Sequence, residues 1–341
     1  MDSLTQVVLG ATCGEVALGK KIGNKAVLFG AIGGTIPDLD VIIGNVFYTN
    51  EIDKIAFHRG FTHSIVFAVI ASLIIGFIVY ESYNSGKRKN TTTLKDWIWL
   101  FFLSIFTHPV LDCFTPYGTQ LFLPFSDYRV AFNTISVVDP LYTFPLLICI
   151  VATLFFRRIN PKRRKWAKAG IYISSFYMLF TIGNKLYIDT VFKKSFQEAN
   201  IAFHRFSVQP TIANAILWYG IAESEDAYHV GFYSLLDTRT RADTILTISK
   251  NHHLLDVNHP DIKTMRWFSN EYYRLSDMDS LSQIIYTDLR YPFLDPKNSD
   301  SAIFTFPLVK RENERYDVIP FGGNKTDNDG LKDFWKRLKG I

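Results

Sequence analysis

The sequence predicts an α+β membrane protein in which an N-terminal bundle of about four to six transmembrane segments precedes a β-rich soluble C-terminal domain. The 341-residue chain is 48% hydrophobic, and its long apolar segments are concentrated in the first 195 residues. From about Phe203, short segments of alternating apolar and polar residues replace them, which is typical of antiparallel strands. We therefore expect a membrane domain over residues 1–195 and a β-rich domain over residues 196–341.

Four of the apolar segments are long enough to be transmembrane helices. Residues 62–80 and 140–156 can cross about 30 Å of hydrocarbon unaided. Residues 96–114 and 169–188 are nearly as apolar, although each carries polar side chains, and we expect both to span.

The first two apolar segments, residues 4–19 and 26–45, are shorter or richer in glycine. Gly10 and Gly14, and then Gly30 and Gly34, follow the four-residue spacing that lets two helices approach closely. These segments can form either a packed hairpin or a re-entrant pair.

The cations of the membrane domain are distributed asymmetrically. One set of turns holds Lys20, Lys21, Lys25, Lys87, Arg88, Lys89, Lys95, Arg157, Arg158, Lys162, Arg163, Arg164, Lys165 and Lys168. The intervening loops hold only Lys54, Arg59 and Arg129. Short cytoplasmic loops retain lysine and arginine, so we expect the basic turns in the cytoplasm and the C-terminal domain outside it. Clustering of this kind also favours membrane topology over nucleic-acid binding, despite the net charge of +5.

The C-terminal domain contains five stretches with the pattern of strands: AILWYGIAES, AYHVGFYSLLD, TILTISK, SQIIYTDLRY and AIFTFPLV. After a polar, glycine-containing stretch at 322–330, LKDFWKRLK predicts a short amphipathic helix. Its apolar residues are Leu331, Phe334, Trp335 and Leu338.

Four polar clusters interrupt the apolar half of the chain. They are PDLD at 37–40, HRGFTHS at 58–64, HPVLD at 108–112 and DP at 139–140. The topology above places all four at the outer ends of spans, although only cations were used to derive it. Ionisable residues at membrane depth are costly and are functional candidates by default.

The spacing within two clusters restricts how they can act. His108 and Asp112 are four residues apart, so a helix would place both on one face. His58 and His63 are five apart, so they can serve one site only if His58 lies in a loop before the helix, and Gly60 allows a helix to start there.

The remaining polar residues have several possible roles. Asp38 and Asp40 are candidates for catalysis, as a general base or as a carboxylate that supports a ligand, and they also fit a helix cap. Arg59 could pair with a substrate phosphate or carboxylate, or extend to the interface. Asp139 is expected to cap a helix that begins at Pro140.

His108 and Asp112 alone also fit a buried hydrogen-bonded pair that fixes helix packing. Apart from Asp139, the clusters supply three imidazoles and three acids, a set that favours a shared metal site. The three cysteines contain no CxxC spacing, which argues against a thiolate zinc site.

Several sequence words resemble those of the YdjM/YbcI family of inner-membrane proteins, whose members are assigned as metal-dependent hydrolases. They are MDSLTQ, GTIPDLD, HRGFTHS, HPVLDCFTPYGTQLFLPFSD and DPLYT, in this order over roughly residues 1–190. The resemblance implies a multi-pass protein of the bacterial inner membrane and a metal-dependent hydrolase activity. It assigns metal binding to Asp40, His58, His63, His108 and Asp112.

The His-x3-Asp pair of His108 and Asp112 also resembles ligands of zinc-dependent phospholipases C, which carry more histidines. One or two divalent ions, with zinc as the expected metal, therefore fit better than a trinuclear centre. The chain has no HExxH for a zinc protease and no GxSxG for a serine hydrolase.

The leading hypothesis is a hydrolase of a lipid or lipid-linked ester or phosphoester at the outer face of the cytoplasmic membrane. The alternative is a non-catalytic metal-binding scaffold or sensor whose C-terminal domain binds a partner that the sequence does not identify. A transporter is disfavoured because the polar residues lie at the ends of the spans.

Overall fold

The computed structural model describes residues 1–278, 283–319 and 328–341. Internal contacts divide the chain into two compact units. The first, called the helical unit below, comprises Met1–Phe47, Phe57–Phe132 and Val137–Thr181. The second, called the β-rich unit, comprises Tyr48–Ala56, Asn133–Ser136 and Ile182–Ile341.

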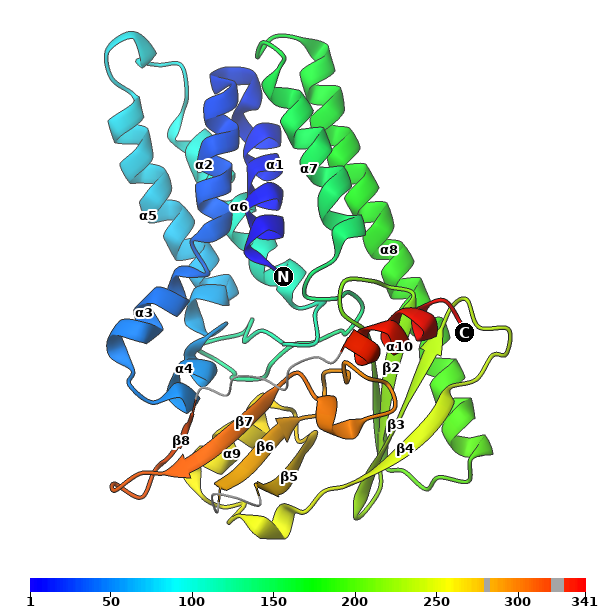
Figure 1. Cartoon of the computed structure of the whole chain (residues 1–341). Coiled ribbons are helices and arrows are strands. Elements are labelled where there is room, and N and C mark those ends of the chain that lie inside the picture. Colours follow the sequence, from blue (N-terminus) through cyan, green and yellow to red (C-terminus); the bar gives the residue numbers. More distant parts are fainter. Residues whose placement is uncertain (279–282, 320–327) are drawn as a thin grey trace. The chain divides into compact units, whose positions relative to one another are not determined.

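The helical unit is an assembly of helices that run between two ends (Figure 1). Its elements are α1 (Ser3–Ile22), α2 (Asn24–Thr35), α3 (Leu39–Phe47), the short 3-10 helix η1 (Phe61–His63), α5 (Ile65–Tyr83), η2 (Gly86–Arg88), α6 (Leu94–Asp112), α7 (Pro140–Leu154) and the first part of α8 (Pro161–Glu198). The turns α1–α2, α5–α6 and α7–α8, which carry the clustered cations, lie together at one end, and the N-terminus lies at the other.

The helices α1 and α2 form a closely packed hairpin, as the glycine spacing predicts. A Cβ atom on Gly10 would overlap the carbonyl oxygen of Gly30 and lie 2.7 Å from Cα of Gly34. Gly14 packs in the same way against Ala26 and Gly30. Only residues without a side chain beyond Cα allow this backbone contact.

Two helical segments are long and apolar enough to cross a membrane, Asn24–Phe47 and Ile65–Tyr83, and Pro140–Leu154 is a shorter apolar helix. The first segment is interrupted between α2 and α3 at Ile36–Asp38, so it is not one continuous helix. The larger number of spans and their orientation stay predictions.

The helix α5 turns its bulky apolar residues outward. Ala68, Ala71 and Gly76 face the core, whereas Ile74 and Phe77 are more than half exposed. Exposed apolar side chains on α7 and α8 give the same pattern, including Phe144, Ile148, Phe176 and Leu179. A helix with small residues inside and large apolar residues outside suits a lipid environment.

The β-rich unit contains two four-stranded antiparallel sheets, with strand orders β1-β2-β3-β4 and β5-β6-β7-β8. The strands are β1 (Arg205–Pro210), β2 (Leu217–Glu223), β3 (Ala227–Ser234), β4 (Asp243–Ser249), β5 (Tyr273–Met278), β6 (Gln283–Asp288), β7 (Thr305–Lys310) and β8 (Tyr316–Val318). The five predicted stretches correspond to β2, β3, β4, β6 and β7. The β-rich character of this part is confirmed.

Helices cover the sheets of this unit. Phe192 and Phe196 of α8 pack with Trp218 of β2. The helix α9 (Pro260–Phe268) and Ile52 of α4 (Glu51–Phe57) pack against the second sheet. The predicted C-terminal helix is α10 (Asn328–Leu338), with Phe334 and Leu338 against the first sheet. Trp335 is exposed, and the side chain of Leu331 lies outside the described residues.

Candidate metal centre

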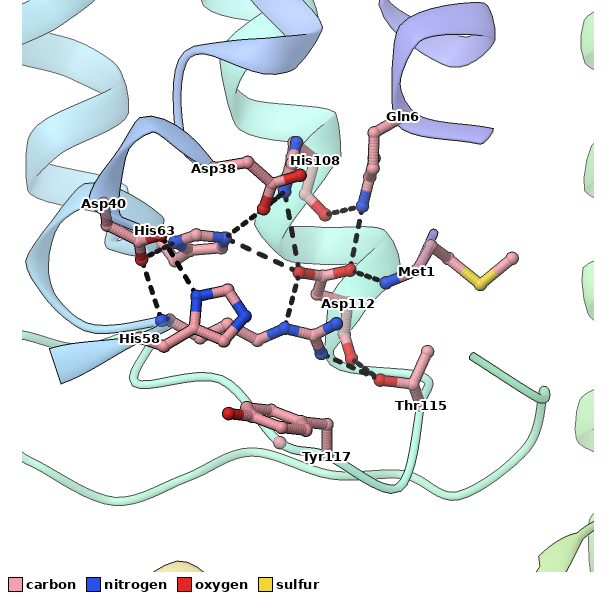
Figure 2. Close-up of polar contacts among 12 residues, drawn as sticks. Met1, Gln6, Asp38, Asp40, His58, His63, His108, Asp112, Thr115 and Tyr117 are labelled. Atoms are coloured by element: carbon pink, nitrogen blue, oxygen red, sulfur yellow. Dashed lines mark hydrogen bonds and ion pairs between the residues drawn. The ribbon is translucent and has the colours of Figure 1, made fainter. Parts of the chain in front are cut away.

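Three segments of the helical unit bring the predicted polar clusters together (Figure 2). The junction of α2 and α3 supplies Asp38 and Asp40, and the connection from α4 to α5 supplies His58, Arg59 and His63. The last turn of α6 supplies His108 and Asp112 on one helix face, as their spacing predicts.

Asp38, His63 and His108 form a group that can hold a metal ion, because one ligand atom of each lies within 4.8 Å of the others. Oδ1 of Asp38 is 3.3 Å from Nε2 of His108 and 3.5 Å from Nε2 of His63. Nitrogen and oxygen ligands at about 2.0–2.1 Å from a tetrahedral zinc ion lie about 3.3–3.4 Å from each other. The spacing of the group therefore fits a single small ion.

Asp112 adds a fourth oxygen to this group. Its Oδ2 atom lies 3.7 Å from Nε2 of His63 and 3.6 Å from Nε2 of His108. All three atoms are buried and have no hydrogen bond in the described part of the chain, although Oδ2 of Asp112 forms an ion pair with Nε of Arg59 at 3.2 Å. Leaving a buried polar atom unpaired costs about 1–3 kcal/mol, so two unpaired imidazole nitrogens that face two carboxylates indicate a site for a cation.

Hydrogen bonds on the far side of each imidazole fix which nitrogen faces the group. Nδ1 of His108 donates to the carbonyl oxygen of Gly34 at 2.6 Å, because a carbonyl can only accept. Nδ1 of His63 is hydrogen-bonded at 3.1 Å to Oγ1 of Thr62, whose hydroxyl donates to Asp40, and it lies 3.3 Å from Oδ2 of Asp40. Both Nε2 atoms then present lone pairs to the group, which is the arrangement that second partners impose on metal-bound histidines.

Asp40 accepts several of the hydrogen bonds that surround the metal group. Its carboxylate accepts from the backbone N–H of Arg59 at 2.9 Å and from Oγ1 of Thr62 at 3.2 Å, and lies 3.1 Å from Nδ1 of His58. It contacts the Nδ1 side of His63 rather than its Nε2 side. The predicted roles of Asp40 and His58 as metal ligands stay predictions.

His58 lies at the edge of the site, with 26% of its side chain exposed. Burial lowers the pKa of His58 below its ordinary value, and the hydrogen bond to Asp40 opposes this shift. The imidazole is therefore disfavoured as a cation, even beside a carboxylate.

Arg59 is buried and locked in place. Its Nε atom is 3.2 Å from Oδ2 of Asp112, Nη1 donates to Oγ1 of Thr115 at 3.0 Å, and the guanidinium lies 4.5 Å from the ring centre of Tyr117. The backbone of Arg59 has a φ of 58°, a left-handed conformation that is uncommon for a residue with a side chain. The predicted contact of Arg59 with a substrate stays a prediction.

Other polar residues support Asp112. Gln6 of α1 donates from Nε2 to Oδ1 of Asp112 at 2.8 Å and to the carbonyl of His108 at 3.3 Å, and the nitrogen of Met1 contacts the same carboxylate oxygen (Figure 2). The sequence analysis missed the role of Gln6. The available signal was an amide side chain just before the apolar run that begins at Val7 of α1.

Asp139 has the capping role that the sequence predicts. Its carboxylate accepts from the backbone N–H groups of Leu141 at 2.9 Å and Tyr142 at 3.2 Å, with Pro140 in the first turn of α7. Tyr177 donates to the other carboxylate oxygen at 2.8 Å. Asp139 therefore acts in helix packing and does not belong to the metal group.

The helical unit thus defines a membrane protein with candidate spans and a possible metal site. Residues 1–188 match the YdjM inner membrane protein family. The chain belongs to this family, and the matched residues include every side chain of the metal group.

Two curated relatives match part of the chain. An uncharacterized protein YfhP of Bacillus subtilis is 34% identical over 147 residues, which cover 41% of this chain and 42% of the relative. The inner membrane protein YbcI of Escherichia coli is 34% identical over 128 residues, covering 34% of this chain and 64% of the relative. The match therefore spans less than two thirds of the length of either relative. No solved structure shows a significant match.

Proposed function

We propose that the protein is a metal-dependent hydrolase of the cytoplasmic membrane that acts on a lipid or lipid-linked ester or phosphoester. The observation that carries the proposal is the convergence of Asp38, His63, His108 and Asp112, in which both imidazole Nε2 atoms are buried without a hydrogen-bond partner. A divalent ion held there would activate water at neutral pH and polarise an ester or phosphoryl oxygen.

The four side chains have different accessibility, which suggests different roles. His63, His108 and Asp112 are at most 1% exposed, whereas Asp38 is 22% exposed. Water and substrate would therefore approach the group from the side of Asp38 and His58. Asp40 is buried and bonded on both oxygens, so it would act by orienting His63 and His58.

Apolar side chains close to the site residues favour a lipid substrate. Leu39 lies between the two acids of the PDLD motif and is exposed, as is Phe61, between Arg59 and His63. The backbone N–H of Gln120 donates to the carbonyl of Arg59 at 3.1 Å, and the turn that follows exposes Phe122 and Phe125. Such residues can enter the membrane interface beside the site.

The geometry also favours a second function, a closed structural metal site in a scaffold or sensor. If Asp112 binds the ion, four protein ligands fill a tetrahedral shell and leave no position for water. X-ray absorption on the metal-loaded protein separates the two functions, because a catalytic site retains a water ligand and a structural site does not.

The direct test is hydrolysis by metal-loaded, full-length protein in mixed micelles with a panel of glycerophospholipids and in solution with p-nitrophenyl phosphate. We expect release of product from a lipid, loss of about 100-fold or more in Asp38→Asn, and no loss in Asp127→Asn, an exposed acid of the same unit. The double variant Phe122→Ser/Phe125→Ser should lose activity on lipid more than on the soluble ester. A metal-saturated protein that hydrolyses no substrate of the panel contradicts the proposal and supports the scaffold.

A further inference from the structure

A second candidate site lies at the other end of the helical unit. A cavity of about 530 Å³ is formed by the second half of α1, the α7–α8 turn and the first turns of α8. Its basic lining residues are Lys20, Lys21, Arg158, Arg163, Arg164 and Lys168. Among its described lining residues, Glu15 is the only acid.

Two of these cations are neutralised within the protein. Arg163 is buried and donates to both carboxylate oxygens of Glu15, with Nε at 2.7 Å from Oε1. It also donates to Asn24 Oδ1 at 2.6 Å. Lys21 pairs with Asp96 at 2.5 Å. Arg163 therefore serves as a fixed wall of the cavity rather than as a free charge.

The other four cations have no ion pair among the described residues, and all four are exposed: Lys20, Arg158, Arg164 and Lys168. Arg158 donates only to a carbonyl, that of Lys21, at 2.7 Å. Four positive charges around one cavity repel each other, and an anion with several oxygen atoms would relieve this repulsion.

Exposed apolar side chains share the same cavity. Val16 and Ile159 line it, and Ile159 is 80% exposed. Phe155, three residues before the lining residue Arg158, is 83% exposed. A cavity for a small soluble anion has no need of such residues, whereas a phospholipid has acyl chains that they can contact.

The cavity and the metal centre are separate. Gln6, which contacts Asp112, and Lys20, which lines the cavity, are fourteen residues apart on α1, which corresponds to about 21 Å along a helix. This distance approaches the thickness of the hydrocarbon core, so a ligand of the cavity would lie near the membrane surface opposite the metal centre.

We propose that this cavity binds the phosphate headgroup of an anionic phospholipid at the basic end of the helical unit. Lys20, Arg158, Arg164 and Lys168 contact the phosphate oxygens, and Val16 and Ile159 contact the first carbons of the acyl chains. A phospholipid and a soluble ligand could both offer a phosphate group to these cations. The test must therefore separate the lipid from a free phosphate.

The test is equilibrium binding of a fluorescent phosphatidylglycerol to full-length protein in zwitterionic detergent micelles. The variant is Lys20→Gln/Lys168→Gln. Its matched control is Lys87→Gln/Lys89→Gln, which removes the same charge from exposed lysines at the same end but outside the cavity. We expect the cavity variant to bind about 30-fold more weakly, since each lysine near an anionic surface contributes roughly 1 kcal/mol, and the control to bind within about threefold of wild type.

Three results would overturn the proposal. An equal loss in both variants would mean that only the general surface charge attracts the lipid. Equal binding of a fluorescent phosphatidylcholine would mean that the headgroup charge is not recognised. Displacement of the lipid by inorganic phosphate or glycerol 3-phosphate at an equal concentration would assign the cavity to a soluble phosphate.

Discussion

At the scale of residues, the central feature is a pair of buried imidazole nitrogens that face two carboxylates without a hydrogen-bond donor of their own. Nδ1 of His63 is hydrogen-bonded to Thr62 and lies beside Asp40, and Nδ1 of His108 donates to Gly34, so the Nε2 lone pairs point at Asp38 and Asp112. Lone pairs and carboxylates at 3.3–3.7 Å repel each other, and Arg59, 3.2 Å from Asp112, offsets this repulsion at only one of the two carboxylates. The metal explains this arrangement better than a helix-packing role does.

The two acids of the PDLD motif should therefore have different effects when neutralised. Asp40→Asn weakens the partner of His63 but leaves the Nε2 side intact, so metal affinity should fall by about 10- to 100-fold. Asp38→Asn replaces a carboxylate of the metal group itself. The metal affinity of this variant should therefore fall further than that of Asp40→Asn. Competition with a fluorescent chelator measures both affinities. If Asp40→Asn costs more than Asp38→Asn, the assignment of these two roles is wrong.

The sequence could predict which residues gather at the site but not what each does there. Spacing put His108 and Asp112 on one helix face, and Gly60 allowed His58 and His63 to share the site. Asp38 and Asp40 have the same chemistry and nearly the same position in the sequence. Which of them faces the imidazole Nε2 atoms depends on the break between α2 and α3, a tertiary feature that the apolar pattern does not encode.

At the scale of elements, the α1–α2 hairpin holds the helical unit together through direct backbone contact. Gly30→Ala should be destabilising, because the added Cβ would overlap the carbonyl oxygen of Gly10 and lie 2.7 Å from Cα of Gly14. We expect a cost of about 1–3 kcal/mol, or a melting temperature several degrees lower in detergent. Gly183→Ala in α8 is the control, because no atom lies within 4 Å of its added Cβ.

That control should be neutral or slightly stabilising, by up to about 1 kcal/mol, since alanine is the better helix former. Equal melting temperatures for Gly30→Ala and the wild type would show that the helices can separate without cost.

The four-residue glycine spacing predicted this contact because it is a local pattern. The strands β1, β5 and β8 and the helix α9 were not predicted, because their apolar residues form no long periodic run.

At the scale of the whole molecule, the basic turns and the metal centre lie at opposite ends of the helical unit, as the cation count predicts. Orientation in the membrane can be tested with a membrane-impermeant maleimide on intact cells. The native cysteines Cys13, Cys113 and Cys149 are buried and give little background. We expect Asp127→Cys to react in intact cells and Lys89→Cys to react only after lysis. The reverse pattern would place the metal centre at the cytoplasmic face.

The metal content of the full-length protein is the most direct test of the proposed metal site. Protein purified in detergent through a tag without histidine would be analysed for elements as wild type, Asp38→Asn, His108→Ala and the exposed control His204→Ala, with folding checked by gel filtration. We expect close to one divalent ion per chain in the wild type and in the control His204→Ala. The site variants Asp38→Asn and His108→Ala should both lose the ion. If all four folded proteins are metal-free after gentle purification and do not take up zinc when it is added, the convergence of these side chains does not form a metal site.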